Sequence, residues 1–262
     1  MTEKDLQLFK AWFSDFTKSF YSSDTEDQKN IMLKVEHTHN VCKNMTAISS
    51  DLSLDENDKR LAETVALFHD VGRFPQYAKY KTFRDADSIN HGLLGVRTLL
   101  KSNVLGQIPE DEQDLIKQVV KFHCALAIPK SIDDRTFFFL KMIRDADKLD
   151  IWRVFIIFYE SPEEERASAT AHNKPDTPGY SQDILLRIND RKIASYSKVI
   201  NINDFKLMKL SWVYDLHFRG TFRLLKERDY INRLAKKLPQ TDEIIKAVQN
   251  INQHIAEKAQ NG

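Results

Sequence analysis

Side chains that bind divalent metals stand at six positions in the first 150 residues of the chain. They are His37, His69, Asp70, His91, His123 and Asp147. His69 and Asp70 are adjacent and directly follow the apolar run Thr64–Phe68. A charged carboxylate is costly to bury unless a counter-charge lies beside it. A divalent cation supplies that charge and also favours neutral imidazole, so the His-Asp pair predicts a metal site.

The donor types indicate which metals bind and how many. Imidazole and carboxylate without thiolate suit Mn, Fe, Zn, Co or Ni, and sometimes Mg. One ion could be held by His37, His69, Asp70 and Asp147, and a second by His91, His123 and the other oxygen of Asp70. A carboxylate can bridge ions about 3.5–4 Å apart, and a water or hydroxide between them is a nucleophile at neutral pH. The pattern therefore predicts two divalent transition-metal ions with Asp70 between them.

Apolar residues recur at helical spacing along most of the chain, so the ligands should stand on separate helices. We expect helices over residues 6–20, 31–45, 55–68, 88–100, 110–124 and 133–158. Asp55 is an expected N-cap, and Gly72 and Pro75 should end the helix that delivers the His-Asp pair. Polar loops are expected from Gln76 to Asp87 and from Ser161 to Gly179.

The scarcity of turn-forming residues, 7 Gly and 7 Pro in 262 positions, favours long helices over a many-stranded fold. Hydrophobic residues make up 42% of the chain, enough for a substantial core. Helical periodicity returns at Ile184 and runs to the end. We therefore expect one all-α domain over residues 1–262, with a metal-binding core at 30–158 and a helical C-terminal extension at 180–262 that completes the fold.

Composition excludes several classes of function. The 39 basic and 38 acidic residues balance to a net charge of +1, which offers no extended surface for nucleic acid. Cys42 and Cys124 form neither a disulfide framework nor a CxxC pair. Met1–Asp5 lacks the pattern of a signal peptide, and the longest apolar stretch, Val154–Tyr159, is too short to span a bilayer. We therefore expect a cytoplasmic protein that does not enter a membrane.

The order of the ligand motifs resembles the HD-domain metal-dependent phosphohydrolase superfamily. The resemblance spans residues 30–158 and rests on His37, on Leu67–Arg73 with its His-Asp pair, and on Arg144–Asp150. It implies an all-α helical bundle, bound divalent metal, and hydrolysis of a phosphoester or phosphoanhydride by a metal-activated water.

Two further histidines are similar to those of a six-ligand branch that binds two metals. They are His91, within Asn90–Gly95, and His123, within Lys121–His123. That branch includes hydrolases of cyclic dinucleotides and of dinucleoside polyphosphates. Cyclic-dinucleotide hydrolases usually carry a His-His pair followed by a Gly-Tyr-Pro loop, whereas His123 is followed here by Cys124–Leu126. This departure argues against cleavage of cyclic dinucleotides.

Alternatives remain open at three of the ligand positions. The motif register favours Asp147, although Asp145 and Asp150 compete with it and Asp150 shares its helix face. His91 and His123 could instead bind substrate phosphate as protonated donors beside a single metal.

Phosphate hydrolysis needs cations besides the metals to hold the non-bridging oxygens. Arg73 and Lys148 are close to ligands in the sequence, and we expect them to bind the phosphate and to be catalytic together with Asp70. Lys81 and Arg84 are further candidates for substrate binding, with a solvated loop as their alternative.

The leading prediction is a phosphohydrolase acting on a small phosphorylated metabolite or nucleotide. Diiron oxygenases use, by resemblance, the same ligand set and are the first alternative. A non-catalytic module that senses a nucleotide is the second. Substrate choice is expected to rest with the loop at residues 76–87 and the helices after Ile184, where the aromatic stretch Trp212–Arg219 either packs between helices or forms a pocket wall.

Overall fold

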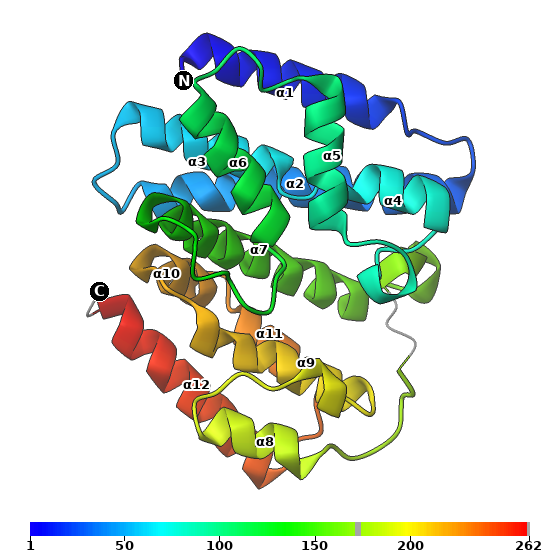
Figure 1. Ribbon diagram of the computed structural model, residues 1–262. Coiled ribbons are helices and arrows are strands. Elements are labelled where there is room, and N and C mark those ends of the chain that lie inside the picture. Colours follow the sequence, from blue (N-terminus) through cyan, green and yellow to red (C-terminus); the bar gives the residue numbers. More distant parts are fainter. Residues whose placement is uncertain (171–173, 261–262) are drawn as a thin grey trace. The chain divides into compact units, whose positions relative to one another are not determined.

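The computed structural model describes residues 1–170 and 174–260, and every regular element within those ranges is a helix (Figure 1). The α-helices are α1 (Glu3–Lys18), α2 (Thr25–Ser49), α3 (Glu56–Phe68), α4 (Arg73–Tyr80), α5 (His91–Ser102), α6 (Glu110–Phe122), α7 (Asp134–Glu160), α8 (Gln182–Asn189), α9 (Ile202–Ser211), α10 (Arg219–Glu227), α11 (Tyr230–Ala235) and α12 (Asp242–Gln260). Short 3₁₀ turns form η1 (Asp85–Asp87), η2 (Glu163–Glu165), η3 (Ser168–Thr170), η4 (Tyr196–Lys198) and η5 (Trp212–Asp215). The predicted all-α fold is confirmed.

The chain divides into two compact units. The first comprises Met1–Asp147 and Ala167–Thr170, and the second comprises Lys148–Arg166 and the described residues from 174 to 260. Helix α7 contributes to both units, with the boundary after Asp147. All six predicted metal ligands belong to the first unit. None of the described helices is both long and apolar enough to cross a membrane.

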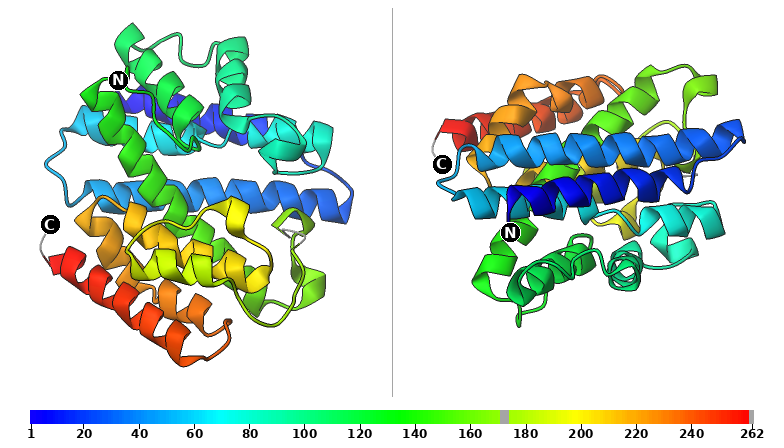
Figure 2. Two further views of the ribbon diagram at one scale, coloured as in Figure 1. Left: turned by 60° about the horizontal axis from the view of Figure 1, so that its bottom comes forward. Right: turned by 90° about the horizontal axis from the view of Figure 1, so that it is seen from above.

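The first unit is organised around α3, whose second half is almost entirely buried. Leu61, Val65, Ala66 and Phe68 on this helix are fully buried, and α3 packs against α1, α2 and α6. Burial of each of the larger side chains contributes about 1.5–3 kcal/mol. Figure 2 shows the long α2 as one continuous helix of this unit. A helix whose last two turns are buried delivers the residues after it to the interior, and here those residues are the His-Asp pair.

Side-chain caps set the start of two helices that carry the ligands. Asp55 accepts a hydrogen bond from the backbone N–H of Asp58 at 2.7 Å, which confirms it as the N-cap of α3. Asn90 accepts one from the N–H of Leu93 at 2.8 Å and caps α5. This helix therefore begins at His91 rather than at Ser88, the residue that periodicity suggested.

The predicted loop from Gln76 is wrong in its first part, because α4 extends to Tyr80. Pro75 lies in the first turn of α4, where its missing N–H leaves no intrahelical hydrogen bond unmade. Gly72 does not end α3, which stops at Phe68, and its φ of −68° is right-handed. Pro75 thus stands at the beginning of α4. Gly72 is the N-cap of that helix and does not terminate α3.

The segment Ser161–Gly179 contains, in its described part, only the short turns η2 and η3. Residues 171–173, which include His172, lie outside the described residues. The N–H of Ser168 donates to Oε1 of Glu26 on α2 at 2.8 Å. This bond ties η3 to the first unit.

The second unit is helical, as predicted for the C-terminal part of the chain. Helix α12 packs against α8 and α10, and α9 packs against α8 and α11. The indole N–H of Trp152, on the last part of α7, donates to the carbonyl oxygen of Lys209 on α9 at 3.1 Å. The ammonium of Lys209 lies 3.5 Å from the ring centroid of Trp212, so this aromatic residue packs within the unit.

Candidate metal centre

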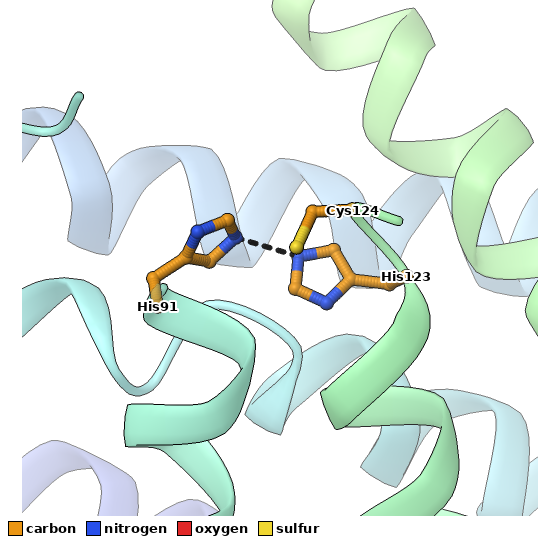
Figure 3. A group of neighbouring side chains, drawn as sticks. All are labelled: His91, His123 and Cys124. Atoms are coloured by element: carbon orange, nitrogen blue, oxygen red, sulfur yellow. Dashed lines mark hydrogen bonds between the residues drawn. The ribbon is translucent and has the colours of Figure 1, made fainter. Parts of the chain in front are cut away.

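Helices α5 and α6 bring two histidines together in the interior of the first unit. His91 is the first residue of α5, and His123 directly follows α6. Both are buried, and their Nε2 atoms lie 3.1 Å apart (Figure 3). Two ligands that are distant in the sequence thus share one position in space.

Two glycines allow this close approach. A Cβ on Gly92 would lie 2.7 Å from the carbonyl oxygen of Lys121, at the end of α6. A Cβ on Gly72 would lie 2.1 Å from the carbonyl oxygen of His91. Real Cβ atoms do not come so near to a backbone oxygen. The absence of a side chain at both positions therefore sets the spacing of α4, α5 and α6.

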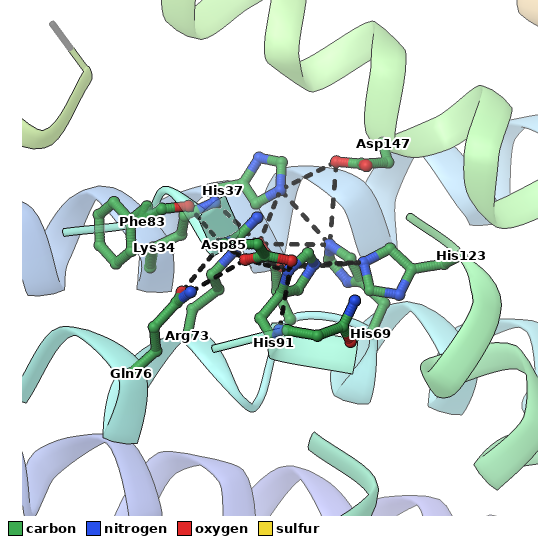
Figure 4. Close-up of polar contacts among 12 residues, drawn as sticks. Lys34, His37, His69, Arg73, Gln76, Phe83, Asp85, His91, His123 and Asp147 are labelled. Carbon is green, nitrogen blue, oxygen red and sulfur yellow. Dashed lines mark hydrogen bonds and ion pairs between the residues drawn. The ribbon is translucent and has the colours of Figure 1, made fainter. Parts of the chain in front are cut away.

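The two carboxylate oxygens of Asp70 face different pairs of histidines. Oδ1 lies 3.4 Å from Nε2 of His91 and 3.7 Å from Nε2 of His123. Oδ2 lies 3.5 Å from Nε2 of His37 and 3.8 Å from Nε2 of His69. Figure 4 shows the four imidazoles directed toward one centre. A carboxylate placed in this way can bridge two cations.

Asp147 completes the half of the centre that contains His37 and His69. Its Oδ1 lies 3.1 Å from Nε2 of His37 and 3.9 Å from Nε2 of His69. Asn44 on α2 donates to the carbonyl oxygen of Ala146 on α7 at 2.9 Å. This bond fixes α7 against α2 directly beside Asp147.

Asp145 and Asp150, the two carboxylates that competed with Asp147 in the sequence, have different surroundings. Asp145 is fully buried two positions before Asp147. Asp150, in the second unit, accepts a hydrogen bond from Arg153 at 2.5 Å. The contacts of Asp147 with His37 and His69 support it as the predicted ligand.

Asp85 in η1 orients one of the histidines and did not stand out in the sequence. Its Oδ2 accepts a hydrogen bond from Nδ1 of His91 at 2.7 Å. Its Oδ1 accepts from Arg73 and from Gln76, each at 2.9 Å. A carboxylate on the far nitrogen of an imidazole is the usual outer partner of a metal ligand. Nothing in the local sequence distinguishes Asp85 from Asp87 in the same turn.

Hydrogen bonds on the outer side of the rings also set their tautomers. Nδ1 of His69 donates to the carbonyl oxygen of Ala66 at 2.7 Å, and Nδ1 of His123 to that of Val120 at 2.9 Å. Because a carbonyl can only accept, each Nδ1 carries the proton and each Nε2 directs a lone pair inward. Nδ1 of His91 likewise carries a proton, which it donates to the carboxylate of Asp85. Buried lone pairs that face one another are stabilised by a cation, so this donor set fits a divalent metal.

Burial also prepares the protonation states that metal binding requires. It lowers the pKa of His69 to about 4 and, with the nearby charge of Arg73, that of His91 to about 3. Burial alone would raise the pKa of Asp70, but the charges of Lys34 and Arg73 hold it well below its usual range. At neutral pH His69 and His91 are therefore neutral and the carboxylate of Asp70 is ionised, as metal binding requires.

Lys34 is a second residue that was not recognised from the sequence. Its ammonium lies 2.8 Å from Oδ2 of Asp70 and 5.2 Å from the ring centroid of Phe83. It precedes His37 by three positions on α2, so the two side chains share a helix face. That spacing is a signal that could have identified it.

The predicted substrate-binding cations have different positions. Nε of Arg73 lies 3.4 Å from Oδ1 of Asp70, which places the guanidinium at the centre. The other three pair with acids elsewhere: Lys148 with Asp215 in the second unit at 2.8 Å, Arg84 with Asp87 at 3.0 Å, and Lys81 with Asp27. Their roles toward a substrate stay predictions.

Comparison with known proteins agrees with this geometry. The family model described as HD domain matches residues 35–188, more than half of the chain. No curated protein matches the chain, and no solved structure does. The match includes the His-Asp pair after α3 and all four of the other predicted ligands. The chain belongs to the HD domain family, whose members are mostly metal-dependent hydrolases.

Proposed function

We propose that the protein is a metal-dependent phosphohydrolase that cleaves a phosphoester or phosphoanhydride of a small metabolite or nucleotide. The observation that supports this best is the position of Asp70, with one pair of histidines on each carboxylate oxygen. Bound divalent ions would supply Lewis-acid polarisation of the phosphate and a nucleophilic water at neutral pH.

The donors divide into two sets that share Asp70. One set would consist of His37, His69, Asp70 and Asp147, and the other of His91, His123 and Asp70. Mn, Fe, Co, Ni and Zn suit these donors, and Mg is an alternative. The family match implies divalent metal, whereas the number and identity of the ions belong to the proposal.

Two cations beside Asp70 support a phosphate-binding site there. Nη1 of Arg73 donates to Asp85, Gln76 and the carbonyl of Phe83, which fixes the guanidinium plane. Nε of Arg73 is buried and makes no hydrogen bond within the described residues, so it can donate to a phosphate oxygen. Lys34 carries a second positive charge to the same side chain of Asp70.

A small substrate agrees with the charge of the chain. The net charge of +1 gives no general attraction for a polyanion, whereas the positive groups at the centre are local. We therefore propose a small phosphorylated substrate and not a nucleic acid. Lys148, Lys81 and Arg84 could contribute only after leaving their present acidic partners.

Metal analysis combined with an activity screen tests this proposal. Purified protein, loaded in turn with Mn, Fe, Co, Ni, Zn and Mg, would be assayed on phosphomonoesters, nucleotides, dinucleoside polyphosphates and pyrophosphate. We expect hydrolysis of at least one substrate class, and Asp70→Ala should lose both the bound metal and the activity. Asp114→Ala, which removes an exposed carboxylate of α6, is the matched control. Metal-loaded protein that hydrolyses nothing in the panel would refute the proposal, and oxygen consumption by the Fe form would favour the oxygenase alternative.

A further inference from the structure

Cys124 lies next to the histidines that α5 and α6 bring together. It follows His123 directly, and its Sγ and one ring nitrogen each of His91 and His123 lie within 4.8 Å of one another. Figure 3 shows the three side chains facing each other. All three belong to the first unit. Nitrogen and sulfur donors are thus gathered at one point.

The two halves of the centre differ in the number of carboxylates. His37 and His69 lie near oxygens of both Asp70 and Asp147. His91 and His123 lie near only one recorded carboxylate oxygen on their Nε2 side, Oδ1 of Asp70. Three protein donors leave room, on a five-coordinate ion, for the proposed water and for one further protein donor.

Asp85 is already engaged in a way that prevents it from acting as that fourth donor. It receives the Nδ1 proton of His91 on the outer side of the ring and also binds Arg73. Cys124 is the remaining group with a metal-binding atom at this half among the described residues. Its thiol is therefore the candidate for the fourth position.

The two histidines give independent evidence that an electrophile belongs there. His91 is 3% exposed and His123 is 5% exposed, and each has its Nδ1 proton committed outward. Their Nε2 atoms face each other at 3.1 Å on the inner side of the rings. Two buried imidazoles that turn their Nε2 atoms to the same point beside the sulfur have the arrangement of ligands around a cation.

We propose that Cys124 is a thiolate ligand of the ion bound by His91, His123 and Asp70. When the Sγ–metal bond forms, the thiol proton leaves to solvent. This half then has two nitrogens, one oxygen and one sulfur, whereas the half with His37 has nitrogens and oxygens only. Sulfur favours Zn, Co and Fe over Mg and Mn, so the two halves should differ in metal preference.

Ligation by Cys124 rests on the two-metal centre of the proposed function, but not on the reaction. Cobalt spectroscopy tests it without turnover, because a thiolate–Co(II) bond gives a charge-transfer band in the near ultraviolet that N and O ligands do not give. We expect Co(II)-loaded wild type to show the band and Cys124→Ser to lose it. Cys42→Ser is the matched control and should keep it, since Cys42 is the other of the 2 cysteines in the chain.

Titration of metal-free protein with Zn gives a second measurement. Cys124→Ser should weaken one of two bound ions by at least about tenfold and leave the other unchanged. In Cys42→Ser protein, saturating Zn should also slow the reaction of Cys124 with a thiol reagent, a measurement that needs no variant at position 124. An unchanged Co(II) band in Cys124→Ser, or a thiol that reacts equally fast with and without Zn, would overturn the proposal.

The two proposals fail in different ways. An active phosphohydrolase without a thiolate band keeps the proposed function and excludes Cys124 as a ligand. A thiolate band in protein that hydrolyses no substrate keeps Cys124 as a ligand and excludes the proposed function.

Discussion

Asp85 accepts a hydrogen bond from Nδ1 of His91 at 2.7 Å, while Nε2 of the same ring lies 3.4 Å from Asp70. The imidazole is thus held between two carboxylates, one outside the centre and one within it. Because the outer carboxylate receives the only ring proton, it determines which nitrogen can bind a metal.

Replacement of Asp85 should therefore weaken metal binding although Asp85 is not a predicted ligand. Asp85→Asn can donate to Nδ1 and so favour the tautomer with its proton on Nε2. We expect a loss of about 10–100-fold in affinity for the ion at His91, measured by competition with a chelator. Asp87→Asn, in the same turn and paired with Arg84, should bind metal as the wild type does. Equal affinities for all three proteins would contradict this role.

Lys34 should contribute to turnover without being needed for metal content. Lys34→Met removes a positive charge 2.8 Å from Asp70 and should lower kcat/KM on the best substrate by roughly 100-fold. Elemental analysis should show the same metal content as in the wild type. Lys59→Met, which removes an exposed lysine paired with Glu56, serves as the control. Full activity in Lys34→Met would remove Lys34 from the site.

Gly92→Ala should separate α5 from α6. The added Cβ would lie 2.7 Å from the carbonyl oxygen of Lys121, so one helix must move. We expect a loss of about 1–3 kcal/mol in the free energy of unfolding and weaker metal binding at His91 and His123. Gly106→Ala is a suitable control, because its Cβ would meet only the side chain of Asn103. Urea unfolding of the metal-free variants measures the first effect, and wild-type stability in Gly92→Ala would show that the helices are not in close contact.

The metal-free protein should lose stability as the pH falls below 6.5. The pKa of His69 is about 4 in the folded protein against 6.5 for an ordinary histidine, because burial disfavours the charged ring. Between these values the unfolded chain binds a proton that the folded chain does not, so acid favours unfolding. The loss approaches about 1.4 kcal/mol per pH unit for each such histidine.

Burial also lowers the pKa values of His91, His39 and His254, so each of these residues likewise makes the folded protein less stable as the pH falls. Urea unfolding between pH 6.5 and about 5 avoids the range in which carboxylates titrate. His69→Gln should show a shallower dependence on pH than the wild type. If the two slopes agree, His69 is not held neutral by burial.

Helical periodicity and local caps were sufficient to predict the elements that carry the ligands. The apolar faces of α3 and α7 and the N-cap Asp55 are properties of short sequence windows, because a helix repeats every 3.6 residues. Helix α4 was missed because Pro75 suggests a break wherever it occurs. Only its place in a first turn, which depends on how the chain leaves α3, makes it compatible with a helix.

The types and order of the six predicted ligands likewise come from the sequence, and the family that they predicted is confirmed. The sequence did not show that Asp85 orients His91, because Asp85 reaches the ring only when separate elements pack together. Lys34 and Cys124 are near ligands in the chain, but their contacts at the centre also depend on that packing. Lys148 shows the converse, since it adjoins a ligand in the chain and yet pairs with Asp215, 67 positions away. A side chain's partners are set by the direction in which its helix face points and by how closely helices approach. For α5 and α6 that approach depends on Gly92, whose meaning appears only once the backbone of Lys121 lies against it.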